Sequence, residues 1–246
     1  MRSSRGINRA AWIKRLAFNG TKKPLMSFLT AFFYDRFMAK TEEACLQDWR
    51  RGLLKQVSGE VLEVGAGTGV NIRFYSGNVT RLVLTEPDKY MRKILKAQVD
   101  NHRLENASVA SGTAEQIESD DESFDYVVAT LVCCSVTDLK SCLREIRRVL
   151  KPGGSLVFLE HVAAADGTSR KRWQNRINPV WKTLMGNCHL NRETEQAIVT
   201  EGFDIIQIYR ESMRKAPPIV RPTIRGIAKK PTMQMQSDPD KAGPLI

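Results

Sequence analysis

The residues best placed to bind a ligand lie in one stretch, residues 61–71, which reads VLEVGAGTGVN. An apolar run that stops at Gly65, Gly67 and Gly69 predicts a buried strand followed by a tight turn and a helix. Glycine lets the backbone take a positive φ, and it lets a ligand approach where a Cβ would collide. We expect the ligand over the amides of a helix N-terminus, at the carboxyl end of a parallel strand. A turn without a ligand would show the same glycines, so the interpretation depends on the residues that follow.

A second candidate ligand group is Glu86, which ends the apolar run 81–86 and lies 17 positions after Gly69. A carboxylate at this place suits a ribose, because it can accept hydrogen bonds from both hydroxyls. A dinucleotide dehydrogenase would share this feature, but its fingerprint is G-x-G-x-x-G. Here the spacing is G-x-G-x-G, with Glu63 two residues ahead of the first glycine. The glycine spacing therefore departs from the dehydrogenase fingerprint.

Two later segments complete a recognisable order of signals: residues 124–129, FDYVVA, and residues 149–154, VLKPGG. With the glycine turn and Glu86, they resemble the class I S-adenosylmethionine-dependent methyltransferases over roughly residues 40–230. The resemblance implies S-adenosyl-L-methionine as the cofactor. It also implies an α/β, Rossmann-like fold, with a mostly parallel seven-stranded sheet whose last strand is antiparallel.

The resemblance also implies roles for individual residues. The three glycines would admit the methionine part of the cofactor, with Glu63 orienting it, and Glu86 would bind the ribose. Thr113 to Glu115 would flank the adenine, although Thr113 stands where the family often has Asp. The residues expected to contact the cofactor are Glu63, Gly65, Ala66, Gly67, Thr68, Gly69, Asn71, Glu86, Pro87, Thr113, Ala114, Glu115 and Leu131.

Several further blocks are similar to one subgroup, the vertebrate enzymes that methylate alkyl thiols and hydrogen sulfide, with their bacterial and plant relatives. These blocks are LVCCSV at 131–136, FLEHVAA at 158–164, NPVW at 178–181 and GNCHLNRE at 186–193. The implied reaction is methyl transfer to a small or lipophilic acceptor, with an alkyl thiol expected. The core also resembles quinone and sterol C-methyltransferases and phospholipid N-methyltransferases, whose acceptors are the alternative. A cofactor-binding module without catalysis is the alternative from another class.

The acceptor side is expected around His161, which ends the predicted strand 154–160 and would face the ligand crevice. It would accept a proton or donate to the bound nucleophile; a histidine that only bonds its neighbours is the alternative. Cys133, Trp181, Cys188 and His189 would wall the acceptor pocket. A buried free cysteine also behaves as a small hydrophobe, and that filler role is favoured over a catalytic thiol for Cys133 and Cys134. No metal site is expected, because these two cysteines are adjacent and no C-x-x-C pair occurs. The region also lacks the Asn- or Asp-Pro-Pro-Tyr element of related enzymes that methylate nucleic acid or glutamine.

The elements that must position these groups follow from apolar spacing, with Asp88 and Asp138 as N-caps. Residues 162–189 are expected to form a variable insertion. The predicted strands are 60–65, 81–86, 107–110, 124–130, 154–160, 203–209 and 223–229. The predicted helices are 41–57, 68–75, 88–102, 138–149 and 191–202.

The net charge of +11 raises the question of whether the protein binds an anionic partner. No nucleic-acid motif occurs, so a nucleic-acid partner is not expected. Residues 1–34 hold seven Lys or Arg and no acidic residue, which suits an anionic membrane surface, although a basic protein without such a partner remains open. We expect residues 1–40 to form an amphipathic lid with membrane affinity; a pure lid or an organellar targeting peptide are alternatives. The vertebrate members of the subgroup carry a hydrophobic anchor there, from which this basic segment departs.

The rest of the chain is expected to form one methyltransferase domain, 41–230, and a disordered tail, 231–246. No apolar run approaches the ~20 residues of a membrane-spanning helix. Five cysteines without a secretory signal indicate reduced thiols. The expected location is intracellular, in the cytoplasm or at a membrane surface, with mitochondria as the alternative.

Overall fold

The computed structural model describes residues 36 and 38–232 of the 246-residue chain. Most of the expected N-terminal segment 1–40, and the tail from residue 233 onward, lie outside the described residues. No helix in the described part is long and apolar enough to cross a membrane.

One seven-stranded sheet forms the centre of the described chain, with strand order β3-β2-β1-β4-β5-β7-β6. The first five strands run parallel, and β7 lies antiparallel between β5 and β6. The predicted fold class is confirmed, including the antiparallel last strand. The strands are β1 Gly59–Val64, β2 Val79–Thr85, β3 Ala107–Ala110, β4 Phe124–Thr130, β5 Leu150–His161, β6 Asp204–Ser212 and β7 Pro222–Lys229.

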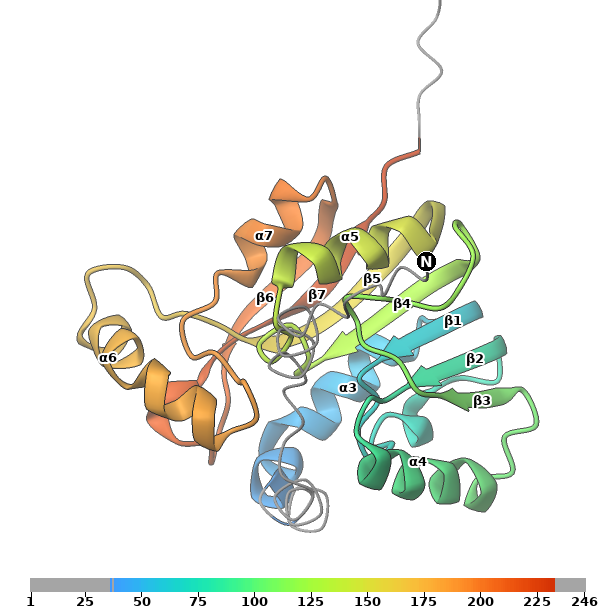
Figure 1. Ribbon diagram of the computed structural model, residues 1–246, viewed down its shortest axis with the longest axis horizontal. Coiled ribbons are helices and arrows are strands. Elements are labelled where there is room, and N and C mark those ends of the chain that lie inside the picture. Colours follow the sequence, from blue (N-terminus) through green and yellow to red (C-terminus); the bar gives the residue numbers. More distant parts are fainter. Residues whose placement is uncertain (1–35, 37, 233–246) are drawn as a thin grey trace, which may run out of the picture.

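Helices cover both faces of this sheet, as Figure 1 shows. On one face, α5 and α7 bury Leu143, Ile146 and Ile198 against the strands. On the other, α3 and α4 bury Leu54 and Leu95. The helical elements are a π-helical turn η1 Glu42–Leu46, α3 Gln47–Leu54, η2 Ile72–Phe74, α4 Lys89–Asn101, α5 Leu139–Val149, α6 Ser169–Leu184, α7 Thr194–Thr200 and η3 Pro218–Val220.

The predicted N-caps explain where two of these helices begin. The Asp88 side chain accepts hydrogen bonds from the amides of Tyr90 and Met91, and Asp138 accepts one from Lys140. Each cap supplies a partner to amides that have none within the helix. These helices return the chain to the sheet, so that β1, β2, β4 and β5 end at one edge. The strand order reverses between β1 and β4, and ligands of such sheets bind in the crevice at this point.

A predicted helix and a predicted turn differ in the structure. Residues 68–75 do not form an α-helix. They contain only the short 3₁₀ turn η2, which ends at Phe74 because Tyr75 takes an extended backbone. The amides of a helix N-terminus are therefore not available as the expected ligand site. The segment 151–154, predicted as a turn before a strand, instead belongs to β5, whose register with β4 shifts there.

The insertion 162–189 contains α6, which the sequence did not predict. Thr168 caps this helix by accepting from the Lys171 amide, and Pro179 lies inside it. Its buried side chain is polar: Gln174 accepts from the Ala164 amide and donates to the Val162 carbonyl. An apolar stripe along one face is the usual sequence signal of a helix. In α6 that signal is missing, because Trp173 is exposed and the amide of Gln174 is buried.

Candidate functional site

The glycine turn after β1 has positive φ at each of its three glycines: 59° at Gly65, 59° at Gly67 and 91° at Gly69. A Cβ added to Gly65 would lie 2.7 Å from Val132 Cγ2, and one added to Gly69 would lie 2.9 Å from Ile72 Cδ1. A Cβ on Gly67 would meet nothing within 4 Å. The outer glycines are therefore required by packing within the protein, whereas Gly67 borders open space that a ligand can fill.

Glu86 lies directly beside this turn. Its Oε2 accepts a hydrogen bond from the Gly67 amide at 2.9 Å, and its Oε1 accepts one from the Asp88 amide at 2.8 Å. A carboxylate oxygen has two lone pairs, and a carboxylate at this place suits the hydroxyls of a ribose. Pro87 follows and is exposed. The carboxylate is thus fixed next to the open space over Gly67, at the carboxyl ends of β1 and β2.

Glu63 is buried below the same turn in a polar network. It accepts hydrogen bonds from Asn71 Nδ2 at 2.9 Å and from the Tyr75 hydroxyl at 2.7 Å. Arg50 in α3 donates to Asn71 Oδ1 at 2.8 Å and to Thr130 Oγ1 at 2.9 Å. Burial raises the pKa of Glu63 to about 7, although two hydrogen bonds and the charge of Arg50 act in the opposite direction. The network holds the base of the glycine turn in one conformation.

The residues expected around the adenine lie after β3 and β4. Thr113 and Gln116 form a short antiparallel bridge, and Ala114 is buried. The Glu115 carboxylate accepts from the Thr137 amide at 2.6 Å, which ties this loop to the segment that follows β4. Leu131 has a φ of 59°. The two turns that would flank an adenine are thus linked to each other.

The segment 131–136 after β4 is held by Glu160, a fully buried carboxylate in β5. Its oxygens accept from the amides of Val132, Cys133 and Cys134 at 2.9, 2.9 and 3.3 Å. Burial raises the pKa of Glu160 to about 6, while these amides lower it. Cys133 lies in the hydrophobic core with none of its surface exposed, a position that suits the filler role.

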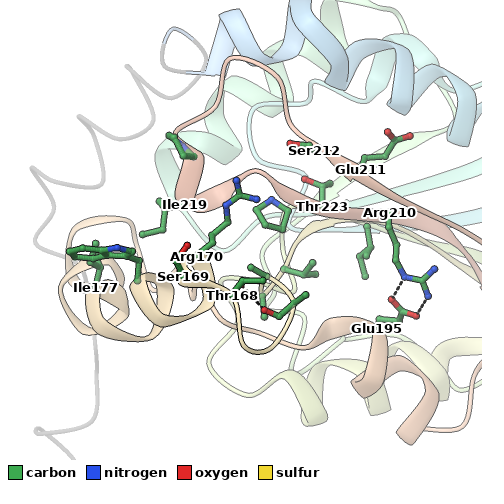
Figure 2. Close-up of a pocket in the computed structure, with 18 residues that line it drawn as sticks. Thr168, Ser169, Arg170, Ile177, Glu195, Arg210, Glu211, Ser212, Ile219 and Thr223 are labelled. Atoms are coloured by element: carbon green, nitrogen blue, oxygen red, sulfur yellow. Dashed lines mark hydrogen bonds and ion pairs between the residues drawn. The ribbon is translucent and has the colours of Figure 1, made fainter.

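A cavity of about 940 Å³ lies between α6 and the strands β6 and β7 (Figure 2). Val162, the residue after His161, lines this cavity together with Ile177 and Ile219. Arg210 and Glu195 form an ion pair within it. None of the residues expected to bind the cofactor lines this cavity, so we do not assign it to the cofactor.

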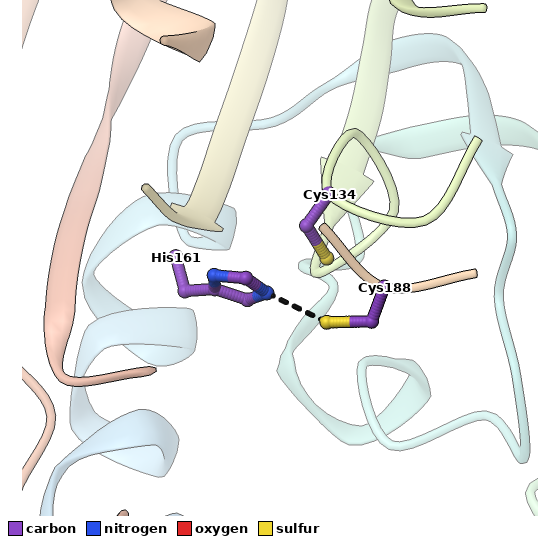
Figure 3. A group of neighbouring side chains, drawn as sticks. All are labelled: Cys134, His161 and Cys188. Carbon is purple, nitrogen blue, oxygen red and sulfur yellow. Dashed lines mark hydrogen bonds between the residues drawn. The ribbon is translucent and has the colours of Figure 1, made fainter. Parts of the chain in front are cut away.

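His161 lies at the end of β5 and meets two cysteines from other segments (Figure 3). Its Nε2 is 2.9 Å from Cys188 Sγ, and the ligand atoms of Cys134, His161 and Cys188 all lie within 4.8 Å of one another. Trp181 Nε1 donates to Cys188 Sγ at 3.3 Å, and the His189 amide donates to the Cys134 carbonyl at 2.7 Å. The structure therefore brings His161, Trp181, Cys188 and His189 together with Cys134, whereas Cys133, also expected to wall the acceptor pocket, lies in the hydrophobic core.

The two thiols of this cluster differ in acidity. The pKa of Cys188 is lowered to about 4, first by its hydrogen bond with Cys134 and then by its contact with His161. The pKa of Cys134 is raised well above its usual value by the same hydrogen bond and by burial. Of the two thiols, Cys188 is therefore the one that ionises more readily.

Three charged side chains that support the site were not predicted from the sequence. Arg50 is buried and forms an ion pair with Glu42 at 3.0 Å, and it reaches the glycine turn from α3. Arg192 Nη1 donates to the Cys133 carbonyl. These are charged side chains on otherwise ordinary segments, and no local spacing marks them. For Glu160 a signal existed, since it is an acidic residue inside an apolar run and such residues are seldom buried unpaired.

A family profile for the methyltransferase domain matches residues 62–158. Thiol S-methyltransferase TMT1B of Rattus norvegicus is 37% identical over 188 residues, which are 75% of this chain and 75% of that protein. Thiol S-methyltransferase TMT1A of Homo sapiens is 37% identical over 172 residues, 69% of this chain and 70% of that protein. The ubiquinone/menaquinone biosynthesis C-methyltransferase UbiE of Shewanella frigidimarina is 30% identical over 177 residues, 69% of this chain and 66% of that protein.

Solved structures share the fold at low sequence identity. A SAM-dependent methyltransferase from Thermotoga maritima has a TM-score of 0.59 at 22% identity, and the match covers 85% of this chain and 100% of that one. A geranyl diphosphate methyltransferase in complex with GPP and sinefungin has a TM-score of 0.62 at 12% identity, covering 76% of this chain and 78% of that one.

Proposed function

We propose that this chain, which belongs to the class I S-adenosylmethionine-dependent methyltransferases, transfers the methyl group of S-adenosylmethionine to an alkyl thiol. The methyltransferase activity and the cofactor follow from the family. The acceptor is the proposal. One observation carries it: 37% identity with a thiol S-methyltransferase extends over 75% of both chains, well beyond the matched domain 62–158.

The residues around the glycine turn fit the cofactor. Gly67 borders space that a Cβ would enter, and the Glu86 carboxylate lies beside it and accepts from the Gly67 amide. S-adenosylmethionine, when bound, supplies a methyl group on a positively charged sulfur. Glu63, held by Asn71 and Tyr75, keeps the turn in place and offers a carboxylate to the methionine part. These residues bind and orient.

Little further chemistry is required of the chain. Orientation of two reactants can supply roughly 7–11 kcal/mol of a barrier. A cysteine thiol has a pKa of ~8.5, so a thiol of this kind is already partly thiolate at neutral pH. His161 is the candidate to hold or receive a proton, through Nε2, the atom that faces Cys188. The sulfur-rich surroundings of His161 favour a soft, uncharged acceptor over a planar amide.

A quinol C-methyltransferase is the second candidate, because UbiE matches 69% of the chain at 30% identity. The acceptor can be identified with a labelled methyl group on the cofactor. Purified protein is offered small alkyl thiols, a demethylated quinol and phosphatidylethanolamine in parallel, with Glu86→Ala as the matched inactive control. We expect label on the thiols alone. Label on the quinol or the phospholipid would contradict the thiol proposal, and no label on any acceptor would favour the non-catalytic binding module.

A further inference from the structure

We propose that Cys134, His161 and Cys188 form a Zn²⁺ site with three protein ligands, and that the fourth position binds the sulfur of the thiol acceptor. The second part rests on the proposed function, whereas the metal site itself does not.

The three ligands converge from separate segments, as Figure 3 shows: the turn after β4, the last residue of β5 and the segment after α6. Their ligand atoms lie within 4.8 Å of one another. Ligand atoms bound to one Zn²⁺ at 2.0–2.3 Å are roughly 3.5–3.8 Å apart. Small side-chain rotations therefore suffice, with the 2.9 Å between His161 Nε2 and Cys188 Sγ widening. His161 and Cys188 are 27 residues apart in the sequence, so the spacing of neighbouring cysteines does not predict that they meet.

The backbone around the cluster is fixed before any ion binds. Glu160 accepts from the amide of Cys134, and the His189 amide donates to the Cys134 carbonyl. Cys134 and His161 are 2% and 4% exposed. Cys188 is the one hydrogen-bond partner of the His161 side chain among the described residues, and His161 Nδ1 is buried without one. Nothing else in the described chain therefore engages the polar atoms of the imidazole, which points at the two sulfurs.

The ligand set selects a borderline metal. Two sulfurs and one imidazole nitrogen suit Zn²⁺, whereas Mg²⁺, Ca²⁺ and Mn²⁺ prefer oxygen. Two thiolates balance the charge of the ion, and Trp181 Nε1 donates to the Cys188 sulfur. Three protein ligands with one position left open are typical of zinc sites that bind a substrate, because structural sites have four.

The open position has a use in thiol methylation. A thiol coordinated to Zn²⁺ loses its proton. Because His161 Nε2 is then a zinc ligand and not a proton acceptor, this proton passes to solvent. The thiolate sulfur then forms a bond to the methyl carbon, and the carbon–sulfur bond of the sulfonium breaks with its electron pair staying on the cofactor sulfur. One thioether, S-adenosylhomocysteine and one proton result. The cluster is near the cofactor turn, because Val132, two residues before Cys134, packs on Gly65.

The test uses Co²⁺ as a spectroscopic substitute for Zn²⁺ on the full-length chain freed of metal by a chelator. We expect a thiolate-to-cobalt charge-transfer band that saturates at one equivalent and disappears on addition of Zn²⁺. Cys134→Ser and Cys188→Ser should each weaken binding by more than about 100-fold, because even partners outside the coordination sphere cost 10–100-fold. Cys45→Ser removes a buried thiol elsewhere and should bind as the wild type does. An added alkyl thiol should shift the band.

The outcomes separate this site from the proposed function. Absence of the band, or equal loss in Cys45→Ser and Cys188→Ser, would overturn the metal site. If the chelator-treated protein methylates thiols at the full rate, the zinc role is overturned while the proposed function stands. If Co²⁺ binds as expected but no thiol shifts the band or is methylated, the three-ligand site stands and its role as an acceptor site falls.

Discussion

Replacing Gly67 by alanine tests two properties of the glycine turn separately: its positive φ and the space that it leaves for the cofactor. The new methyl group would touch nothing of the protein within 4 Å, so the substitution costs only the positive φ of 59° and the space above the turn. Gly167 offers a matched control, because its φ is 77° and a Cβ there would also meet nothing within 4 Å. It lies far along the chain, before α6.

The magnitudes follow from this geometry. A residue other than glycine in the left-handed region costs about 1–2 kcal/mol. For a domain of this size each kcal/mol lowers the melting temperature by about 2–4 °C. Both variants should therefore lose similar stability. Gly67→Ala should also lower the affinity for S-adenosylmethionine at least about tenfold, or about 1.4 kcal/mol, because the methyl occupies the space assigned to the cofactor.

Isothermal titration calorimetry with S-adenosylmethionine measures both affinities, and thermal unfolding measures both stabilities. We expect equal losses of stability and a loss of affinity in Gly67→Ala alone. Equal affinities for the two variants would refute the assignment of the space over Gly67 to the cofactor, since the φ strain is shared.

Three other substitutions test neighbouring parts of the structure. Glu86→Ala should weaken S-adenosylmethionine binding by more than about tenfold in calorimetry, and unchanged binding would remove Glu86 from the site. Glu63 has a pKa of about 7 in the fold against an ordinary 4.5, so the native state holds the proton more tightly and its unfolding free energy falls as pH rises through this window. Relative to Glu63→Gln, the wild type should lose about 3 kcal/mol between pH 4.5 and 7 in urea unfolding, and parallel pH profiles would contradict the burial argument. Gly226→Ala would place a Cβ 2.0 Å from the Gln207 carbonyl oxygen and should cost about 3 kcal/mol; a wild-type urea midpoint would show that β7 can move away from β6.

The fold could be predicted largely because its signals are local. Central strands such as β1 and β4 are buried on both faces and appear in the sequence as short apolar runs. The caps at Asp88 and Asp138 depend on amides two or three residues away. The sequence failed where contacts between distant residues are involved. Tyr75, predicted to be helical, is extended and its hydroxyl donates to Glu63. The helix α6 was not predicted, and its buried side chain is the amide of Gln174.

The candidate site divides in the same way. The glycine turn and Glu86 follow from a spacing within one strand–turn–strand unit, and the structure places them 2.9 Å apart. The support from Arg50, the carboxylate of Glu160 and the sulfur pair around His161 depend on tertiary contacts between segments far apart in the sequence. Such contacts leave no period or motif in the chain, so they could be found only from the structure.

The central claim is that the cofactor binds over Gly67 with its ribose at Glu86. A crystal structure of the protein with S-adenosylhomocysteine tests this most directly. We expect both ribose hydroxyls within hydrogen-bond distance of the Glu86 carboxylate and the ligand in contact with Gly67. A ligand bound elsewhere, for example in the cavity beside α6, with no contact to Glu86, would contradict it.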